Sequence, residues 1–389
     1  MPPTPAAPAT GRAPDTAPGP APEVRVPYDA LLAFTTGVLR ARGLPGGRAA
    51  TAAEALCHGD LTGFTTHGLT NLARLYLPLL DSGRCDPQAE PETVTDTGAA
   101  VLLDARRALG LWAAAEAMDL AAERARTHGI GMVSVRGGTH FGCAGFHALR
   151  AVGQGMIGLA AANCGHQRLV PPPGGAAPML GTNPLALASP AGDHPPFTLD
   201  MSTSVVPTGR IRAAARAGET IPPGWLSDAS GGDVTDPAAY DRGEAELRWL
   251  GGDPERGVHK GFGLGLLVEV LSALVPGAGV GPQPVAGRKP TARPDDDVGY
   301  FLLAVAPATL RSPGAFATAA TGLFGALLDC PPHDPDEPVR YPGWHEQRRS
   351  RERRAHGVPL SAALHTELRA VADATGLPFP DAVVSGGAV

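Results

Sequence analysis

The sequence predicts a mixed α/β fold (α+β), with a helical domain formed by both ends of the chain. Between residues 131 and 201, short apolar segments of strand length alternate with a segment of helical spacing. Both chain ends instead carry apolar side chains mainly at helical spacing. With 389 residues, the chain exceeds the usual size of one domain. We therefore expect a helical domain of residues 26–95 and 307–389 around an α/β domain of residues 96–306.

Composition excludes several classes of protein. Residues 1–25 are mostly Pro, Ala, Thr and Gly, which predicts a disordered leader, and they lack the basic start and apolar stretch of a signal peptide. No later segment approaches the roughly 20 apolar residues that span a bilayer. The net charge of -6 provides no basic field for nucleic acid, and five cysteines without CxxC spacing make a poor disulfide framework. We expect a cytoplasmic protein that binds neither nucleic acid nor membranes.

Three helices are expected in the first part of the chain. Residues 27–42 place apolar side chains at helical spacing, and Gly43 follows as a stop. The alanine-rich residues 48–61 predict a second helix, and a third follows His67. His67 is therefore expected at a junction between helices.

The middle of the chain predicts alternating strands and helices. A helix over residues 109–126 leads into an apolar, glycine-bounded strand at 131–135, and His140 follows that strand. The other expected strands are 157–162, 185–188, 197–201 and 300–305. The other expected helices are 144–152, one that begins at His259, 313–328 and 360–375.

Gly261, Gly263 and Gly265 imitate part of a dinucleotide-binding fingerprint. They open a helix without the preceding strand and the downstream acidic residue that a Rossmann crossover requires. Small residues at these positions favour close packing of the helix instead. We therefore expect a non-Rossmann domain.

Six short motifs occur in a fixed order along the chain. They are Thr66-His67-Gly68, Thr139-His140-Phe141-Gly142, Asn163-Cys164, Leu180-Gly181-Thr182-Asn183-Pro184, Asp200-Met201-Ser202 and His259-Lys260-Gly261. In this order they resemble the type-2 malate/L-lactate dehydrogenase family, over about residues 26–380. The resemblance implies an enzyme that reduces 2-oxo acids with NADH or NADPH, binds its cofactor without a Rossmann domain and forms a homodimer.

His67 and His140 are the candidate acid/base residues. Hydride transfer to a carbonyl carbon leaves negative charge on oxygen, so a proton donor is needed within hydrogen-bond reach, and imidazole titrates near the working pH. The resemblance implies that one histidine is the acid/base and the other holds the substrate. We favour His140, because it follows a buried strand directly. Thr66 either hydrogen-bonds to the substrate or to His67, or caps the following helix.

The resemblance also implies a set of cofactor contacts. They are Asn163, Cys164, Thr182, Asn183, Asp200, Met201, Ser202, His259, Lys260 and Gly343. Asp200 can accept hydrogen bonds from ribose hydroxyls or from the nicotinamide amide, and Lys260 offers a charge for pyrophosphate or ribose. Considered alone, such residues are more often a strand-end carboxylate and a helix-terminal lysine. No metal site is expected, because the histidines and cysteines lack the convergent spacing of a zinc site.

Asn71 stands where the resemblance implies an arginine that binds the substrate carboxylate. Losing that arginine removes a bidentate charged contact. Arg74 can replace it only if the helix register shifts. Cys164 and Trp344 also depart from the family pattern. Three interpretations follow: a reductase of 2-oxo acids, which in reverse is a 2-hydroxy acid dehydrogenase; a ketimine reductase acting on piperideine- or pyrroline-2-carboxylate; and a nucleotide-binding protein that has lost turnover.

Overall fold

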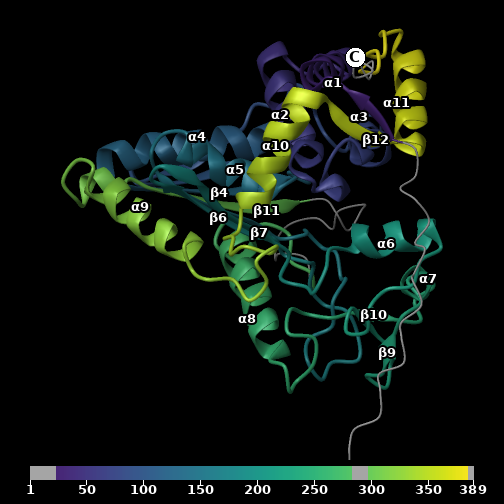
Figure 1. The fold of residues 1–389 in the computed structure, drawn as a ribbon. Coiled ribbons are helices and arrows are strands. Elements are labelled where there is room, and N and C mark those ends of the chain that lie inside the picture. The colour runs from purple at the N-terminus through teal and green to yellow at the C-terminus, as the bar shows by residue number, and fades with distance from the viewer. Residues whose placement is uncertain (1–22, 283–296, 384–389) are drawn as a thin grey trace, which may run out of the picture.

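A seven-stranded mixed sheet forms the centre of the computed structural model, which describes residues 23–282 and 297–383 (Figure 1). The strand order is β2-β3-β4-β11-β5-β6-β7, and only the pair of β3 and β4 is parallel. The strands are β2 (Glu92–Asp96), β3 (Ala100–Asp104), β4 (Ile130–Gly138), β5 (Ile157–Ala162), β6 (Leu185–Ala191), β7 (His194–Met201) and β11 (Val298–Val305).

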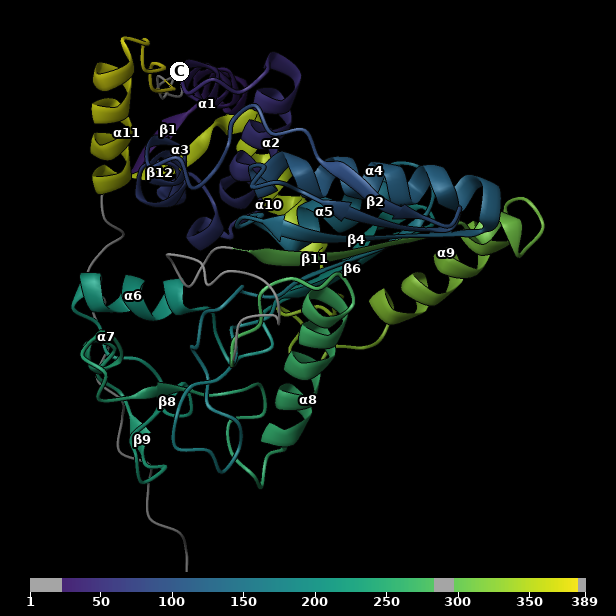
Figure 2. The same ribbon diagram turned by 180° about the vertical axis from the view of Figure 1, so that it is seen from behind.

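Helices cover both faces of this sheet (Figures 1 and 2). On one face lie α4 (Gly110–His128) and α5 (Ala144–Val152). On the other lie α8 (Val258–Glu269), which continues into a π-helical turn, and α9 (Ala315–Leu328). A Cβ at Gly131 would overlap the backbone of α4, and one at Gly158 would overlap the backbone of α5. These two glycines therefore let the helices pack closely on the strands.

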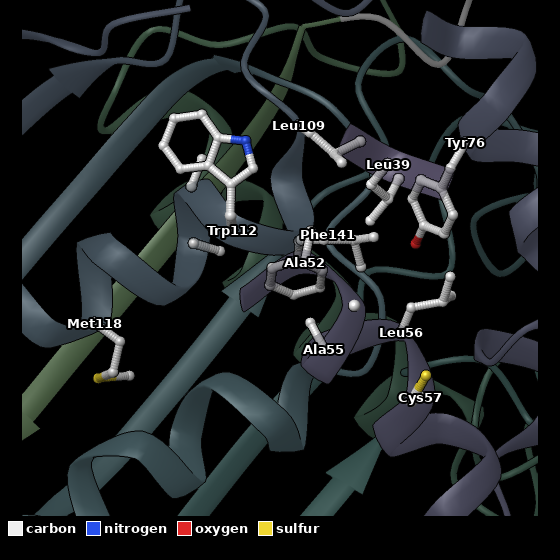
Figure 3. Packing of buried hydrophobic residues seen from close by; sticks show 14 of the residues in the cluster. Leu39, Ala52, Ala55, Leu56, Cys57, Tyr76, Leu109, Trp112, Met118 and Phe141 are labelled. Atoms are coloured by element: carbon white, nitrogen blue, oxygen red, sulfur yellow. The ribbon is translucent and has the colours of Figure 1, made fainter. Parts of the chain in front are cut away.

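The main apolar cluster joins α4 to the N-terminal helices (Figure 3). Trp112 and Met118 of α4 are fully buried, and so is Leu56 of α2 (Gly46–Thr62). Buried alanines on α4 leave room for these larger side chains. Replacing Trp112 with alanine would cost about 3–5 kcal/mol in the free energy of unfolding, because the site cannot fully close.

The two chain ends meet in a helical region beside the sheet. β1 (Glu23–Val26) pairs antiparallel with β12 (Val358–Ser361). Around this pair lie α1 (Tyr28–Ala41), α2, α3 (Leu77–Asp81), α10 (Trp344–His356) and α11 (Ala362–Thr375). Between α10 and α2, Arg353 donates to the carbonyl of Asp60. The end of α2 is thereby held where the candidate site begins.

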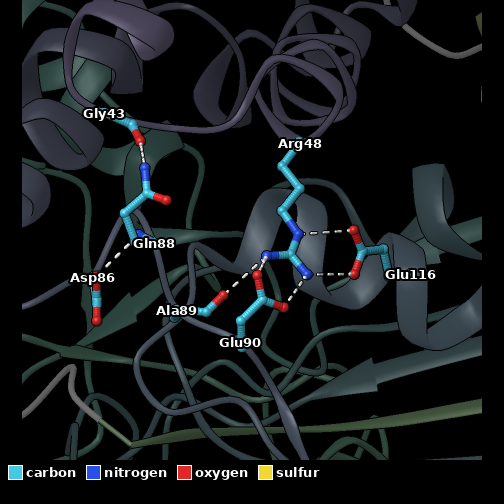
Figure 4. A network of polar contacts seen from close by, with 7 residues as sticks. All are labelled: Gly43, Arg48, Asp86, Gln88, Ala89, Glu90 and Glu116. Atoms are coloured by element: carbon cyan, nitrogen blue, oxygen red, sulfur yellow. Dashed lines mark hydrogen bonds and ion pairs between the residues drawn. The ribbon is translucent and has the colours of Figure 1, made fainter.

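Arg48 anchors the other end of α2 (Figure 4). Its guanidinium forms a fork with Glu90, at 2.8 and 2.9 Å, and a further bond with Glu116 of α4 at 3.1 Å. It also lies 4.0 Å from the centre of the Trp112 ring. Two-point contacts of this kind add geometric specificity, so Arg48 fixes the angle between α2 and α4.

A separate lobe, residues 205–250, lies below the sheet in Figure 1. It contains α6 (Thr208–Ala217), α7 (Ala238–Asp241) and a small sheet of order β10-β8-β9, with β8 (Leu226–Ser227), β9 (Asp233–Val234) and β10 (Glu246–Leu247). Its own apolar cluster includes Ile211 and Trp249. Two-residue strands carry no readable periodicity, and the sequence did not predict this lobe.

The mixed α/β class is confirmed, and the helix at 144–152 and the strand at 157–162 have the predicted bounds. The expected leader lies outside the described residues apart from 23–25, which belong to β1 and so are ordered, contrary to the prediction. The division into two domains stays a prediction. Among the described residues, none of the helices combines the length and the apolar character needed to cross a membrane.

Candidate active site

Two histidines from distant parts of the chain face each other where the helical region meets the sheet. His67 ends the 3-10 turn Thr65–His67 that follows α2, and His140 lies just after β4. Their rings are nearly parallel, with 18° between the planes and 5.9 Å between the centroids. Both side chains are half-buried, so a ligand can reach them. The structure thus brings together the two residues expected to handle the proton.

His140 is hydrogen-bonded twice on the same nitrogen. Its Nδ1 lies 2.8 Å from the Tyr76 hydroxyl oxygen and 3.2 Å from the backbone nitrogen of Gly142. Because a backbone N–H can only donate, Nδ1 is unprotonated and the neutral ring carries its hydrogen on Nε2. Burial, and to a smaller extent the charge of His67, lowers the pKa of His140 from 6.5 to about 3. His140 is therefore a neutral hydrogen-bond donor through Nε2.

His67 has a different set of neighbours. The Thr66 hydroxyl lies 3.0 Å from its Nδ1, and burial lowers the pKa of His67 below 6.5. Asn71 donates to the carbonyl of Thr66 at 2.9 Å. On the other side, a Cβ added to Gly209 would lie 3.0 Å from the Cβ of Thr66, so the first turn of α6 packs on this residue. The observed partner of the Thr66 hydroxyl is thus His67.

A buried carboxylate lies under the turn that carries His67. A Cβ on Gly59 would approach the nitrogen of Gly68 to 2.7 Å, and one on Gly68 would overlap the carboxylate of Asp60. Asp60 Oδ2 accepts the N–H of Leu69 at 2.5 Å. Burial raises the pKa of Asp60 to about 7. The carboxylate therefore holds the segment that follows His67 against α2.

A pocket between α2, α5, β7 and α10 contains two of the expected cofactor residues, Asp200 and Gly343. Asp200 ends β7 and accepts the N–H of Gly145 at 2.8 Å. Burial, with Glu346 as a smaller cause, raises the pKa of Asp200 to about 6. The pocket is lined by His58, Thr62, Phe64, Gly145, Leu149, Thr198, Asp200, Gly343, Glu346 and Gln347. Phe64 comes from the chain just before the His67 turn, and Gly145 from the helix just after His140, so the pocket and the histidine pair are built from neighbouring chain segments, although neither histidine lines the pocket.

Asn163 and Asn183 are placed inside the protein. Both are buried, and their amides donate to the two oxygens of the Glu269 carboxylate at 3.4 and 2.8 Å. Asn163 also donates to the carbonyl of Gly279 at 2.6 Å. Burial raises the pKa of Glu269. In this structure the two amides hold the ends of β5 and β6 against α8.

Cys164, Thr182, Met201 and Ser202 lie along the same strand ends. The Cys164 sulfur is 3.8 Å from the Thr182 hydroxyl, and Ser202 donates to the carbonyl of Ser204 at 3.1 Å. Burial raises the pKa of the Cys164 thiol. Met201 is half-buried at the end of β7. Met201 and Ser202 directly follow Asp200 in the chain, at the end of β7.

His259 and Lys260 lie in the exposed first turn of α8. Within residues 23–282 and 297–383, no hydrogen bond or ion pair joins either side chain to Asp200. The structure therefore separates this pair from the pocket that holds Asp200 and Gly343.

Arg74 is already paired within the protein. Its guanidinium binds Glu367 of α11 by two hydrogen bonds of 3.0 Å each. The π-helical turn Leu72–Tyr76 does alter the helix register here. Even so, the charge of Arg74 is directed to α11, and Asn71 is bonded to Thr66. Both expected substrate contacts are thus engaged by the chain itself.

Sequence reasoning missed Tyr76, Asp60 and the first turn of α6. An acidic residue on the otherwise apolar face of α2 was a signal for Asp60. The contact of Tyr76 depends on the π-helical turn, and that of α6 on a lobe without readable strands. Neither contact left a pattern in the sequence.

Comparison with known proteins agrees with this geometry. Residues 26–369 match the family model for malate/L-lactate dehydrogenase. The chain is 40% identical over 255 residues to a malate dehydrogenase of Pyrococcus abyssi, covering 65% of this chain and 69% of that one. It is 32% identical over 346 residues to an L-sulfolactate dehydrogenase of Methanocaldococcus jannaschii, covering 88% and 95%.

A solved structure extends the comparison to imine chemistry. The Δ1-piperideine-2-carboxylate reductase of Pseudomonas syringae superposes with a TM-score of 0.77 at 26% identity, covering 89% of this chain and 99% of that one. The family match spans most of the chain and includes both histidines and the Asp200 pocket. This chain therefore belongs to the malate/L-lactate dehydrogenase family and is an oxidoreductase.

Proposed function

We propose that this protein reduces a 2-oxo acid, or a closely related cyclic imine acid, with NADH or NADPH, and in reverse oxidises a 2-hydroxy acid. The observation that carries the proposal is the stacked pair of His67 and His140, together with a polar pocket that contains Asp200 and Gly343 and is built from neighbouring chain segments. A proton-transfer pair and a polar pocket for a nucleotide are the two parts that such a reaction needs.

His67 is the proton donor in this proposal, the reverse of the role expected from sequence. His140 carries its hydrogen on Nε2 and accepts on Nδ1, so losing that hydrogen would leave an imidazolate. His140 can therefore polarise the substrate oxygen by a hydrogen bond but not protonate it. Two imidazolium rings 5.9 Å apart repel each other, so only one carries a charge. Because Nδ1 of His140 already accepts two hydrogen bonds, that one is His67.

The polar lining of the Asp200 pocket suits a hydroxyl or amide donor at the edge of a bound nucleotide. Within the part of the chain that the structure describes, the Thr198 hydroxyl is buried without a partner and lines the pocket, as does the Asp200 carboxylate. A hydroxyl or amide of the nucleotide that reaches this lining would satisfy both. When bound, NADH or NADPH supplies the hydride. A central sheet with a single parallel pair supports binding without a Rossmann crossover.

In this proposal the substrate carboxylate lies beside the contact of Thr66 with the first turn of α6, and not within that contact. Arg74 is held by Glu367, whereas Arg210 forms no ion pair within the described residues and only stacks over Trp225 at 4.9 Å. Arg210 follows Gly209, which packs on Thr66. The amino end of α6 adds a partial positive charge. Arg210 is therefore the cation proposed to balance an anionic substrate.

A ketimine reductase is the second candidate. The specific observation in its favour is Asn71, whose amide donates to the carbonyl of Thr66. This position therefore offers no arginine that could bind the carboxylate of a simple oxo acid with two hydrogen bonds. In that reaction His67 would protonate the imine nitrogen. The complete set of His67, His140 and Thr66 argues against a protein that only binds nucleotide.

The chain is also proposed to work as a cytoplasmic homodimer. Its cysteines are all free thiols, as suits a reducing compartment. On α9, the Leu323 and Leu327 side chains are 59% and 44% exposed, and on the neighbouring π-helical turn Leu274 is 62% exposed. Apolar faces of this kind are typical of surfaces that bind a second subunit.

The experiment that tests the proposal measures NADH and NADPH consumption with a panel of 2-oxo acids and cyclic imine carboxylates. Turnover of an oxo acid supports the first function, and turnover of the imines alone supports the second. Tight nucleotide binding without turnover of any member would contradict both.

A further inference from the structure

Among the residues that the structure describes, Tyr76 is the side chain that is hydrogen-bonded to the ring of His140. It is fully buried in the main apolar cluster (Figure 3), and its hydroxyl lies 2.8 Å from His140 Nδ1. A buried hydroxyl without a partner is costly, so this bond is maintained. Burial raises the pKa of Tyr76 well above its usual value, so the hydroxyl keeps its hydrogen.

Two donors meet at this one nitrogen. Gly142 presents its N–H to Nδ1 at 3.2 Å and cannot reverse its role. The Tyr76 hydroxyl can rotate, but Nδ1 is the acceptor at 2.8 Å, so it donates there as well. A hydrogen on Nδ1 would face the Gly142 N–H, so that contact would be lost, and the Tyr76 hydroxyl would have to rotate and accept. The pair therefore favours the form with hydrogen on Nε2.

A local irregularity of the helix brings Tyr76 to this position. Leu77 N–H bonds to the carbonyl of Leu72, five residues earlier, as in a π-helix. The residue added by a π-helical turn rotates the side chains that follow by about 100° relative to a regular α-helix. Such turns are frequent at functional sites. The turn thereby points the Tyr76 side chain toward His140. The α3 helix that follows still packs in the apolar cluster.

We propose that Tyr76 is a positioning residue, delivered by the π-helical turn Leu72–Tyr76, that holds His140 in the neutral form with its hydrogen on Nε2. His140 then always presents a donor to the substrate oxygen. This inference rests on the proposed function only for its effect on turnover, because the hydrogen bond itself joins two residues of the chain.

The test compares Tyr76→Phe with Tyr300→Phe. Tyr300 is a matched control, because its buried hydroxyl donates to the carbonyl of Thr139, next to His140, without touching the ring. Protein labelled with ¹⁵N-histidine reports the hydrogen position from the Nδ1 and Nε2 shifts, and the loss of a signal in His140→Gln assigns them. We expect the native protein and Tyr300→Phe to show hydrogen on Nε2.

In Tyr76→Phe we expect the two nitrogen shifts to move toward each other, because Nδ1 loses its shorter donor contact and keeps only the Gly142 N–H at 3.2 Å, so a larger fraction carries hydrogen on Nδ1. For the same reason we expect the pKa of His140 to rise. With a substrate found by the panel, kcat/KM should fall roughly tenfold while NADH affinity stays unchanged. Unchanged nitrogen shifts in Tyr76→Phe would overturn the inference. Altered shifts with unchanged kcat/KM would uphold the positioning role and overturn the proposed role of His140 in turnover.

Discussion

The backbone N–H of Gly145 donates to the Asp200 carboxylate over 2.8 Å and thereby ties the first turn of α5 to the end of β7. The short loop before Gly145 carries His140. The proposed nucleotide pocket and the histidine pair are thus parts of one connected structure. A ligand that binds at Asp200 is therefore expected to affect the position of His140 through this loop.

Asp200→Ala should weaken NADH binding by about 1–3 kcal/mol, because a charged hydrogen bond is lost in a half-buried pocket. Lys260→Ala should have a smaller effect, since Lys260 is exposed on α8. Fluorescence titration of both variants, with exposed Asp193→Ala as the control, measures the difference. A larger loss of NADH affinity in Lys260→Ala would indicate that the nucleotide binds at the first turn of α8.

His67→Gln should lower kcat and kcat/KM together by roughly 10²-fold or more, because it removes the acid, while NADH still binds. His140→Gln should lose less, since the glutamine amide can still donate to the substrate oxygen. His128→Gln at the end of α4 serves as the control. If His140→Gln proves the more damaging, the two roles are reversed.

Stability should fall as the solution is made acidic from pH 6.5 to 4.5. Burial lowers the pKa values of His58, His140 and His147 to about 4, 3 and 3 and also lowers that of His67, so the unfolded chain binds more protons on these four groups. Asp60 and Asp200, raised to about 7 and 6, and Glu269, also raised by burial, bind more protons in the folded state. Four histidines against three buried carboxyls leave an excess on the order of one proton, which corresponds to roughly 1.4 kcal/mol per pH unit. Urea midpoints that rise on acidification would refute this sign.

Arg210→Gln should raise KM for an anionic substrate roughly tenfold and leave nucleotide affinity unchanged, because it removes the proposed counter-charge. Arg216→Gln, at the other end of α6, removes the same charge without approaching Thr66. Equal KM values in the two variants would place the substrate carboxylate elsewhere.

Paired Leu323→Glu and Leu327→Glu substitutions should convert the proposed dimer into a monomer, because they put charge into a face that a second copy would cover. Light scattering coupled to gel filtration gives the mass. Leu310→Glu is the control, since Leu310 is 76% exposed and lies outside α9. A native protein that already elutes as a monomer would contradict the proposed dimer.

Sequence reasoning predicted the elements whose apolar pattern is strong and missed those held by other parts of the molecule. The α5 helix has a clear apolar face, and its bounds were predicted correctly. The α10 helix, with its run of arginines and no buried residue, has no such face and was not predicted. Its position depends on contacts such as that of Arg353 with Asp60, which only the folded chain creates.

The candidate site likewise contains residues that the sequence predicted and residues that it missed. His67 and His140 were found because motifs in a fixed order marked them. Tyr76 was not found, because one π-bonded residue changes where a helix points without changing its composition. The partners of Asn183 and Arg74 likewise come from segments far along the chain.

The lobe of residues 205–250 has an apolar cluster that shares no residue with the main one, yet Gly209 brings it against Thr66. Substitutions inside the lobe are therefore expected to be energetically independent of those around the histidines. Evolution can therefore change the side of the site that the lobe forms while His67 and His140 stay in place. In engineering terms, exchanging the lobe between relatives would also require matching Val170, Leu180 and Val258, which belong to its apolar cluster but lie outside residues 205–250.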